Sequence, residues 1–195
     1  MSRSTCARCS FITQRCICDI LISPIAHRIK VYVLRDPSET KHAKNTAILL
    51  PLVFKNTTII DGSIDAIIEQ VNAISITNAA ILYPSETAQS LDNTNLTIDT
   101  LIVLDGSWKK AYKLFMSIPV LQSLPCVSFA NPPATRYTIR KSKLNYSLSS
   151  FEATAHALKA IELIDVSPAL TFFDRFITMQ ISSMPKHVQS RYFQK

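Results

Sequence analysis

The chain has 195 residues, enough for one domain with a sizeable core and a small appendage, but short for two full domains. Hydrophobic residues make up 47% of the chain, which excludes wholesale disorder, and its two glycines exclude the glycine-rich phosphate loops of Rossmann dehydrogenases and P-loop enzymes. The formal net charge is +7, and a basic protein of this kind is expected to meet a polyanion unless the charges simply form a solvated surface.

The N-terminus begins without the apolar run that a secretory signal needs, and the chain contains no uncharged apolar stretch of 18 residues. We therefore expect a cytoplasmic protein that does not contact membranes. In such a reducing compartment, cysteines act as thiols or metal ligands more often than as disulfides.

Four of the five cysteines lie within 13 residues in the pattern C-x2-C-x6-C-x-C: Cys6, Cys9, Cys16 and Cys18. Four neighbouring thiolates can supply the tetrahedral sulfur shell of a structural zinc site, and a segment of this size does not fold without metal. We therefore predict that residues 1–20 form a zinc knuckle. An iron–sulfur cluster, free thiols and two disulfides are the alternatives. Cys126, in an apolar run, is expected to be a buried core thiol.

Residues 21–195 alternate short apolar runs with helical patterns, which predicts an α/β domain with a mostly parallel sheet and helices on both faces. Strands are expected at 29–34, 57–60, 79–83, 101–104 and 126–129. Helices are expected at 64–74, 107–116, 149–164 and from 167 towards 184. The third helix begins with a capping box, Ser149-x-x-Glu152, and the fourth with Ser167 as a cap before Pro168.

Helix 107–116 carries apolar residues on one stripe and lysines on the other side. The stripe of Trp108, Ala111, Tyr112 and Phe115 is expected to be buried, with Trp108 as its anchor in the core. The opposite side carries Lys109, Lys110 and Lys113.

Charge is distributed unevenly along the middle of the chain. Residues 56–105 contain seven acidic side chains and no Lys or Arg, whereas residues 106–151 contain seven basic side chains and no acidic one. Within the second stretch, residues 136–146 interleave basic side chains with two tyrosines, a combination that binds phosphates and stacks on unpaired bases. We predict an RNA interface there, with a solvated loop as the alternative. Its expected contacts are Lys109, Lys110, Arg136, Arg140, Lys141 and Lys143.

Two junctions are candidate ligand sites, because open parallel sheets bind ligands outside the carboxyl ends of their strands. Asp105-Gly106-Ser107 follows strand 101–104 directly, and Pro84 follows strand 79–83. Gly106 allows a tight turn, Ser107 can cap the next helix, and Asp105 can face a ligand. An ordinary strand–turn–helix junction would use the same residues, and the capping box alone would account for Glu152.

In order along the chain, these motifs resemble the DTW-domain family, tRNA-uridine aminocarboxypropyltransferases of the wider SPOUT-like superfamily. The resemblance rests on the cysteine pattern, Arg35–Glu39 with Asn45-Thr46, Leu82–Glu86, Leu104-Asp105-Gly-Ser-Trp108, Arg140 and Leu148–Ala153. Two positions depart from the family pattern. Ser107 stands where the family has threonine, and Ala47 stands where it has glycine after Asn-Thr.

The resemblance implies a SPOUT-like knotted fold and S-adenosylmethionine as donor of a 3-amino-3-carboxypropyl group to N3 of a uridine in tRNA. We expect Asp105 to accept or orient the N3 proton, because a positioned carboxylate is a suitable general base. The residues expected to bind the donor are Tyr83, Pro84, Gly106, Ser107, Trp108, Ser149, Ser150 and Glu152. A methyltransferase on the same fold and a non-catalytic zinc-knuckle RNA-binding module are the alternatives.

Overall fold

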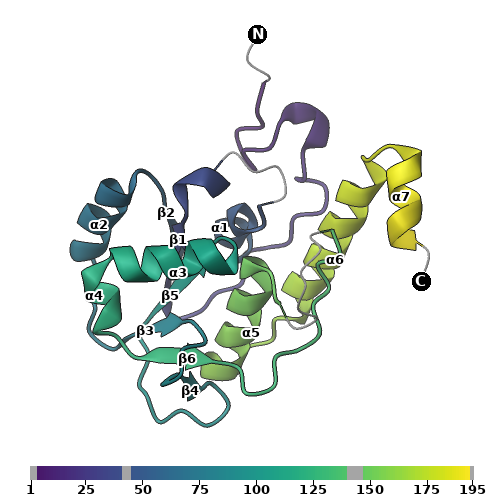
Figure 1. Ribbon diagram of the computed structural model, residues 1–195. Coiled ribbons are helices and arrows are strands. Elements are labelled where there is room, and N and C mark those ends of the chain that lie inside the picture. The colour runs from purple at the N-terminus through teal and green to yellow at the C-terminus, as the bar shows by residue number, and fades with distance from the viewer. Residues whose placement is uncertain (1–3, 41–44, 140–146, 194–195) are drawn as a thin grey trace.

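The computed structural model describes residues 4–40, 45–139 and 147–193 (Figure 1). Within them, six strands form one all-parallel sheet in the order β2-β1-β5-β3-β6-β4. The strands are β1 (Lys30–Arg35), β2 (Thr57–Ile60), β3 (Ala79–Leu82), β4 (Gln89–Ser90), β5 (Thr100–Asp105) and β6 (Cys126–Ser128). The five strands expected from the sequence are confirmed, and β4 is a short addition at the sheet edge.

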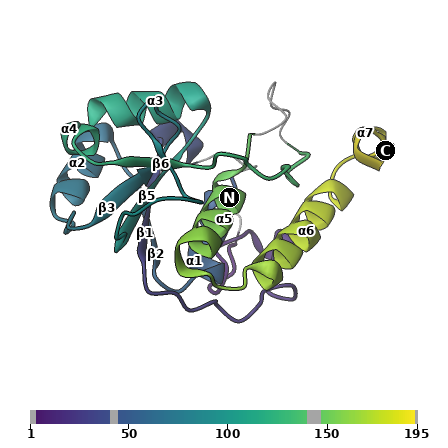
Figure 2. The same cartoon turned by 90° about the horizontal axis from the view of Figure 1, so that it is seen from below.

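Helices cover both faces of this sheet, as the continuous apolar runs of its central strands require. Figure 2 shows α2, α3 and α4 on one face and α1, α5 and α6 on the other. The helices are α1 (Leu50–Val53), α2 (Ile64–Asn72), α3 (Trp108–Ser117), α4 (Pro119–Gln122), α5 (Ser150–Glu162), α6 (Ser167–Ser182) and α7 (Lys186–Phe193), with 3-10 turns η1 (Thr13–Arg15), η2 (Pro37–Glu39) and η3 (Ala47–Leu49). The predicted α/β class is therefore confirmed. Among the described residues, no helix has both the length and the apolarity needed to cross a bilayer.

Each face of the sheet has its own hydrophobic core. Alternate residues of the central strand β5 point to opposite sides, so that Leu101 and Val103 belong to one core and Ile102 and Leu104 to the other. All six residues of β5 are buried. The central strand is thus fixed from both sides, and its carboxyl end is a rigid place for a functional side chain.

Capping explains where two of the long helices begin. The predicted capping box is confirmed, because the Ser149 hydroxyl accepts from the Glu152 amide at 3.2 Å and the Glu152 carboxylate accepts from the Ser149 amide at 3.0 Å. The expectation that Ser167 caps the last long helix is wrong. Ser167 is the first residue of α6, and its amide donates to the Asp165 carboxylate at 2.9 Å, so the preceding aspartate supplies the hydrogen bond.

The buried stripe of α3 differs from the expected one. Ala111 and Leu114 are the residues that α3 buries fully, whereas Trp108 and Tyr112 are 46% and 54% exposed. The helix is rotated so that Leu114, rather than Trp108, anchors it in the core. Periodicity placed the apolar face one position away because Trp108 and Tyr112 are apolar residues that the fold leaves at the surface.

The N-terminal cysteine segment packs on the main body. Cys9 and Ile17 are fully buried in the same core as α5 and α6, and the Phe11 ring lies 5.9 Å from that of Phe176 in an edge-on arrangement. The sequence predicts a boundary at residue 20 between a cysteine knuckle and the α/β domain. The two segments share one hydrophobic core, and whether each folds as a separate unit stays a prediction. Cys126 is buried, as expected.

Candidate functional site

A cavity of about 770 Å³ opens at the carboxyl ends of β3, β5 and β6. Its wall includes Tyr83 and Pro84 after β3, Asp105 at the end of β5, and Phe129 after β6. The first turns of α3 and α5 close other sides, through Trp108 and through Ser149 with Ser150. The volume lies within the range of pockets that hold drug-sized ligands. The cavity therefore lies where ligands bind to open parallel sheets.

Asp105 is the acidic residue at the centre of this wall, and it is 4% exposed. Two side chains from distant parts of the chain donate to it: Asn45 Nδ2 to Oδ2, and Ser150 Oγ to Oδ1, both at 2.5 Å. Asn45 is itself held, because its Oδ1 accepts from the Ala47 amide at 2.9 Å. Each carboxylate oxygen has a second acceptor position, so Asp105 can still accept a hydrogen bond from a ligand.

Burial raises the pKa of the Asp105 carboxyl above its ordinary value. The hydrogen bonds from Ser150 and Asn45 oppose this shift because they stabilise the charged form, as does the nearby cationic Arg35, while the negative charge of Glu39 adds to it. A carboxylate whose pKa is raised is a stronger proton acceptor than an exposed one. This environment suits a group that exchanges a proton with a ligand.

Two ion pairs fix the charged residues next to Asp105. Arg35, at the end of β1, donates from both Nε and Nη2 to Asp61, with the Nε to Oδ1 distance at 2.6 Å. Lys110 of α3 contacts the buried Glu39 carboxylate at 2.7 Å. Because these side chains are mutually engaged, they set the field around Asp105 without projecting into the cavity.

The junction between β5 and α3 brings backbone into close approach. A Cβ at Gly106 would lie 2.9 Å from Cβ of Lys110, so a larger residue would push α3 away from the strand. Ser107 occupies the N-cap position of α3, but its hydroxyl makes no capping hydrogen bond, contrary to expectation. The Ser107 side chain lines the cavity instead.

Aromatic residues form another part of the cavity wall. The Tyr83 ring stacks on Phe115 with centroids 5.3 Å apart and planes at 15°. Burial raises the pKa of the Tyr83 phenol, with smaller contributions from Tyr112 and Cys126. Trp108 joins this wall from the first turn of α3. Stacked, fixed rings of this kind can hold a planar group such as a nucleobase.

Most of the predicted donor-binding residues meet at this cavity. Its lining includes Tyr83, Pro84, Gly106, Ser107, Trp108, Ser149 and Ser150. Glu152 does not belong to the lining. Its carboxylate instead accepts from the Arg136 amide at 2.5 Å, the Thr135 hydroxyl at 3.0 Å and the Ser149 hydroxyl at 2.7 Å. Glu152 therefore ties the segment before residue 140 to the start of α5 and shapes the cavity from behind.

Sequence reasoning did not select Asn45 or Thr46 as site residues, and it expected Tyr137 to stack on RNA bases, although all three line the cavity. Asn45 and Thr46 belong to a motif that carries the family resemblance, and that motif was the available signal. Tyr137 is buried and packs on Phe173 of α6, with ring centroids 5.7 Å apart. Nothing local in the sequence distinguishes it from a surface tyrosine in a basic loop.

The predicted RNA contacts have different surroundings. Lys109 is exposed on α3, whereas Lys110 and Arg136 are engaged with Glu39 and Asp174 respectively. The remaining predicted contacts, Arg140, Lys141 and Lys143, lie outside the described residues. Their role stays a prediction.

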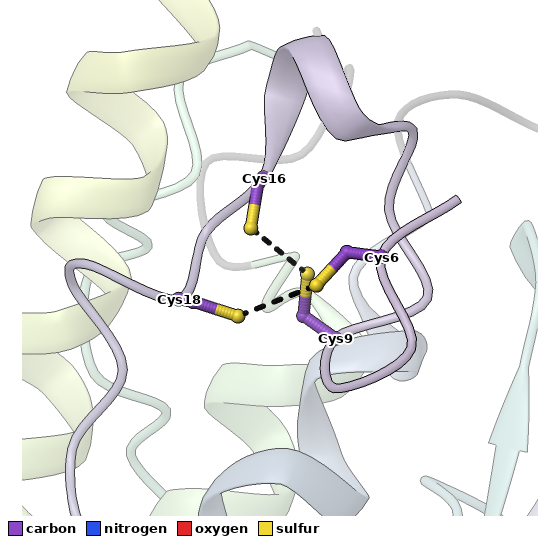
Figure 3. Close-up of side chains that lie close together, drawn as sticks. All are labelled: Cys6, Cys9, Cys16 and Cys18. Carbon is purple, nitrogen blue, oxygen red and sulfur yellow. Dashed lines mark hydrogen bonds between the residues drawn. The ribbon is translucent and has the colours of Figure 1, made fainter. Parts of the chain in front are cut away.

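The four N-terminal cysteines converge on one point (Figure 3). All four are free thiols, and their sulfur atoms lie within 4.8 Å of one another. The Sγ atoms of Cys6 and Cys18 are 3.6 Å apart, and those of Cys9 and Cys16 are 3.7 Å apart. A disulfide needs about 2.05 Å, whereas a tetrahedral site with metal–sulfur bonds of about 2.3 Å separates its sulfurs by about 3.8 Å. The cluster therefore matches a four-thiolate metal site and can hold a metal ion.

The thiols already interact as a set. Backbone amides of Cys9 and Arg8 lower the pKa of Cys6 to about 6, whereas the hydrogen bond with Cys16 is the main cause that raises the pKa of Cys18 to about 12. The pKa values of Cys6 and Cys18 are thus shifted in opposite directions. A bound cation would lower the pKa of all four thiols, because it stabilises the four thiolates together.

Comparisons with known proteins agree with the motifs. The family model described as the DTW domain matches residues 3–181. The protein named tRNA-uridine aminocarboxypropyltransferase 2 from Mus musculus is 26% identical over 170 residues, which cover 82% of this chain and 57% of the mouse protein. The protein of the same name from Drosophila melanogaster is 26% identical over 171 residues, covering 82% of this chain and 67% of its own length.

The chain thus spans little more than half the length of the mouse relative. No solved structure matches it. Because the family model covers nearly the whole chain, from the cysteine cluster to α6, the chain belongs to the DTW-domain family.

Proposed function

We propose that this protein transfers the 3-amino-3-carboxypropyl group of S-adenosylmethionine to N3 of a uridine in tRNA, with release of methylthioadenosine. The observation that carries the proposal is the cavity around Asp105, which the family's motifs surround from three separate parts of the chain. The names of the mouse and fly relatives support the same transfer and the same class of RNA.

The cavity has a group suited to each part of the proposed donor. The first turn of α5 presents backbone amides beside Ser149 and Ser150 at the cavity, and such amides suit the donor's carboxylate. Asp105 offers a negative charge to the ammonium or sulfonium group. The aromatic wall of Tyr83 and Trp108 suits the adenine ring. Glu152 would support this arrangement by holding the segment at Thr135 in place.

The reaction requires little beyond alignment and one proton transfer. Uridine N3 loses its proton, the nitrogen forms a bond to the donor's γ-carbon, and the carbon–sulfur bond breaks with its electron pair left on sulfur as a neutral thioether. Asp105, whose pKa is raised by burial, takes or orients the proton through its remaining acceptor positions. The sulfonium makes the γ-carbon electrophilic without further activation, so alignment of the three reacting atoms accounts for the rest.

The remaining expectations belong to the same proposal. Zinc is the metal of the cysteine cluster, supported by the sulfur spacing, and its role is structural because all four ligand positions are filled by protein. Exposed Lys109 and the basic segment that includes Arg136, Arg140, Lys141 and Lys143 contact tRNA phosphates. The SPOUT-like knot follows from the resemblance, and the free thiols are consistent with a cytoplasmic location.

The test is incubation with bulk tRNA and S-adenosylmethionine labelled in the aminocarboxypropyl chain, followed by nucleoside mass spectrometry. The expected product is a uridine that carries the labelled chain. The matched control for an Asp105→Asn variant is Asp99→Asn, the same change at a half-exposed aspartate that pairs with Arg28 just before the amino end of the same strand, β5. Transfer of a methyl group instead would identify a methyltransferase, and RNA binding without any adduct would identify a binding module.

A further inference from the structure

The outer face of α3 carries large apolar side chains at the surface. Trp108, Tyr112 and Met116 are 46%, 54% and 47% exposed, and three of the five large hydrophobic residues exposed in the described chain lie on this one helix. They follow one another at intervals of four residues, so they form a row along the helix. The row starts at the cavity, because Trp108 is part of its wall.

Helical geometry separates this row clearly from the buried side of α3. At about 100° per residue, Trp108, Tyr112 and Met116 lie within an arc of about 80°. Leu114, which is fully buried, lies on the opposite side of the helix, and buried Ala111 lies between Leu114 and Trp108. The exposed row therefore belongs to a face that the fold does not use for packing.

Two lysines border the row. Lys109 and Lys113 follow Trp108 and Tyr112 by one residue each, and both are exposed. Lys110 lies further round the helix, where it pairs with Glu39. Residues 106–151 contain no acidic side chain, so Lys109 and Lys113 have no acidic partner on the same helix. They lie beside the row of large apolar side chains instead.

We propose that this face, defined by Trp108, Tyr112, Met116, Lys109 and Lys113, binds the single-stranded RNA segment that flanks the modified uridine. A base stacks on the ring of Tyr112, one helical turn from Trp108 at the cavity rim, and the two lysines bind the adjoining phosphates. The proposal rests on the proposed function for the identity of the RNA, and it adds the surface that presents the target nucleotide to the cavity.

Charge favours RNA over a second copy of the chain as the occupant. In a symmetric dimer each surface patch meets its own equivalent, so Lys109 and Lys113 would face the same lysines of the other copy without acidic partners. An RNA strand instead supplies a phosphate beside each base. The spacing also fits, since the row spans about 12 Å along the helix from the cavity rim outwards.

Tyr112 connects this face to the site. It follows Trp108, a cavity residue, by four residues, so it lies one turn further along α3. A base stacked on Tyr112 would therefore lie next to the cavity wall rather than at a remote surface. A flanking nucleotide held there leaves its neighbour within reach of the cavity.

The only tryptophan of the chain, Trp108, provides a direct readout. We would titrate the full chain with an eight-nucleotide oligouridylate and follow tryptophan fluorescence, expecting saturable quenching. Tyr112→Ala should weaken binding roughly 5- to 100-fold, from the loss of one stacked base, whereas Tyr112→Phe should bind as the wild type does. Ile76→Ala, which shortens an exposed apolar side chain on a loop before β3, is the control and should have no effect.

The lysines are tested by salt dependence. Lys109→Gln with Lys113→Gln should reduce the slope of log affinity against log salt by about 1.4, at about 0.7 for each single-strand phosphate contact. The matched pair Lys30→Gln with Lys55→Gln removes two exposed lysines at the other end of the strands and should leave the slope unchanged.

Several results would overturn the inference. One is that Tyr112→Ala binds oligouridylate with the affinity of the wild type. Another is that the Lys109 and Lys113 variant keeps the salt slope of the wild type. A third is that the wild type sediments as a dimer and Tyr112→Ala as a monomer. Donor binding measured by calorimetry separates this test from the proposed function. If labelled tRNA product forms while Tyr112→Ala binds oligouridylate normally, the α3 surface is wrong and the proposed function stands.

Discussion

Replacement of Asp105 by asparagine should preserve the fold and abolish most of the activity. The introduced side chain can direct its carbonyl oxygen to Asn45 Nδ2 and its amide to Ser150 Oγ, because a serine hydroxyl accepts as well as donates. Both contacts then survive as neutral hydrogen bonds. A hydrogen bond to a charged group contributes about 1.5–3 kcal/mol and a neutral one about 0.5–1.5 kcal/mol. The two weakened bonds therefore lower the free energy of unfolding by about 2 kcal/mol. The variant recovers part of this loss, because it no longer buries a charge.

Asp105→Ala is the informative comparison for stability. It leaves the buried Asn45 amide and the half-buried Ser150 hydroxyl without their acceptor, at a cost of about 1–3 kcal/mol for the Asn45 amide and less for the Ser150 hydroxyl. Denaturant unfolding followed by circular dichroism should therefore rank the alanine variant clearly below the asparagine variant. Equal stability of the two variants would contradict the hydrogen-bond arrangement around Asp105.

The pH dependence of the stability difference has a definite sign. The pKa of Asp105 is raised by burial above its ordinary value of 3.8, so its carboxyl stabilises the fold fully below that value. This contribution is lost as the pH rises through the folded pKa. The free energy of unfolding of the wild type, measured relative to Asp105→Asn, should therefore fall as the pH rises above the ordinary value of 3.8. A difference that does not change with pH would refute the assignment of a raised pKa.

Activity provides the decisive measurement. If Asp105 takes or orients the N3 proton, single-turnover transfer to tRNA by Asp105→Asn should be about 10²- to 10⁴-fold slower. A higher pH should partly restore the rate, because uridine then ionises without help. Turnover near that of the wild type at neutral pH would leave Asp105 as a residue that only shapes the cavity wall.

Three further predictions concern the supports of the site. Cys9→Ser should lose the bound metal in elemental analysis, and a chelator should lower Tm of the wild type but not of this variant; substoichiometric metal in reduced wild-type protein would contradict the metal site. Glu152→Gln should lower the free energy of unfolding in denaturant by about 3–5 kcal/mol. In either orientation, the NH2 group of the glutamine faces a backbone N–H, of Arg136 or of Ser149, which then has no acceptor. A loss below about 1 kcal/mol would refute this role of Glu152. Trp108→Ala should cost only about 1–2 kcal/mol because the ring is half exposed, while donor affinity by calorimetry falls; unchanged donor affinity would remove Trp108 from the donor site.

The sequence determined the α/β class and the positions of the main elements. The run Leu101–Leu104 is apolar without alternation, which only a strand covered on both faces tolerates, and the structure confirms β5 at the centre of the sheet. The start of α5 was equally predictable, because the reciprocal hydrogen bonds of Ser149 and Glu152 depend on a spacing of three residues alone. The cysteine cluster was also predictable, because all four cysteines lie within 13 residues of one another along the chain.

Tertiary structure decided which of these residues face the cavity. Periodicity treated Trp108 and Tyr112 as core residues because it measures apolarity, whereas their exposure depends on how α3 is rotated about Leu114. The environment of Asp105 was also beyond local sequence. Asn45 and Ser150 lie 60 and 45 residues away along the chain, and only the crossing connections of a parallel sheet bring a loop and a helix start to the end of β5. Local spacing fixes local hydrogen bonds, but the pKa and the partners of a buried carboxylate depend on distant segments.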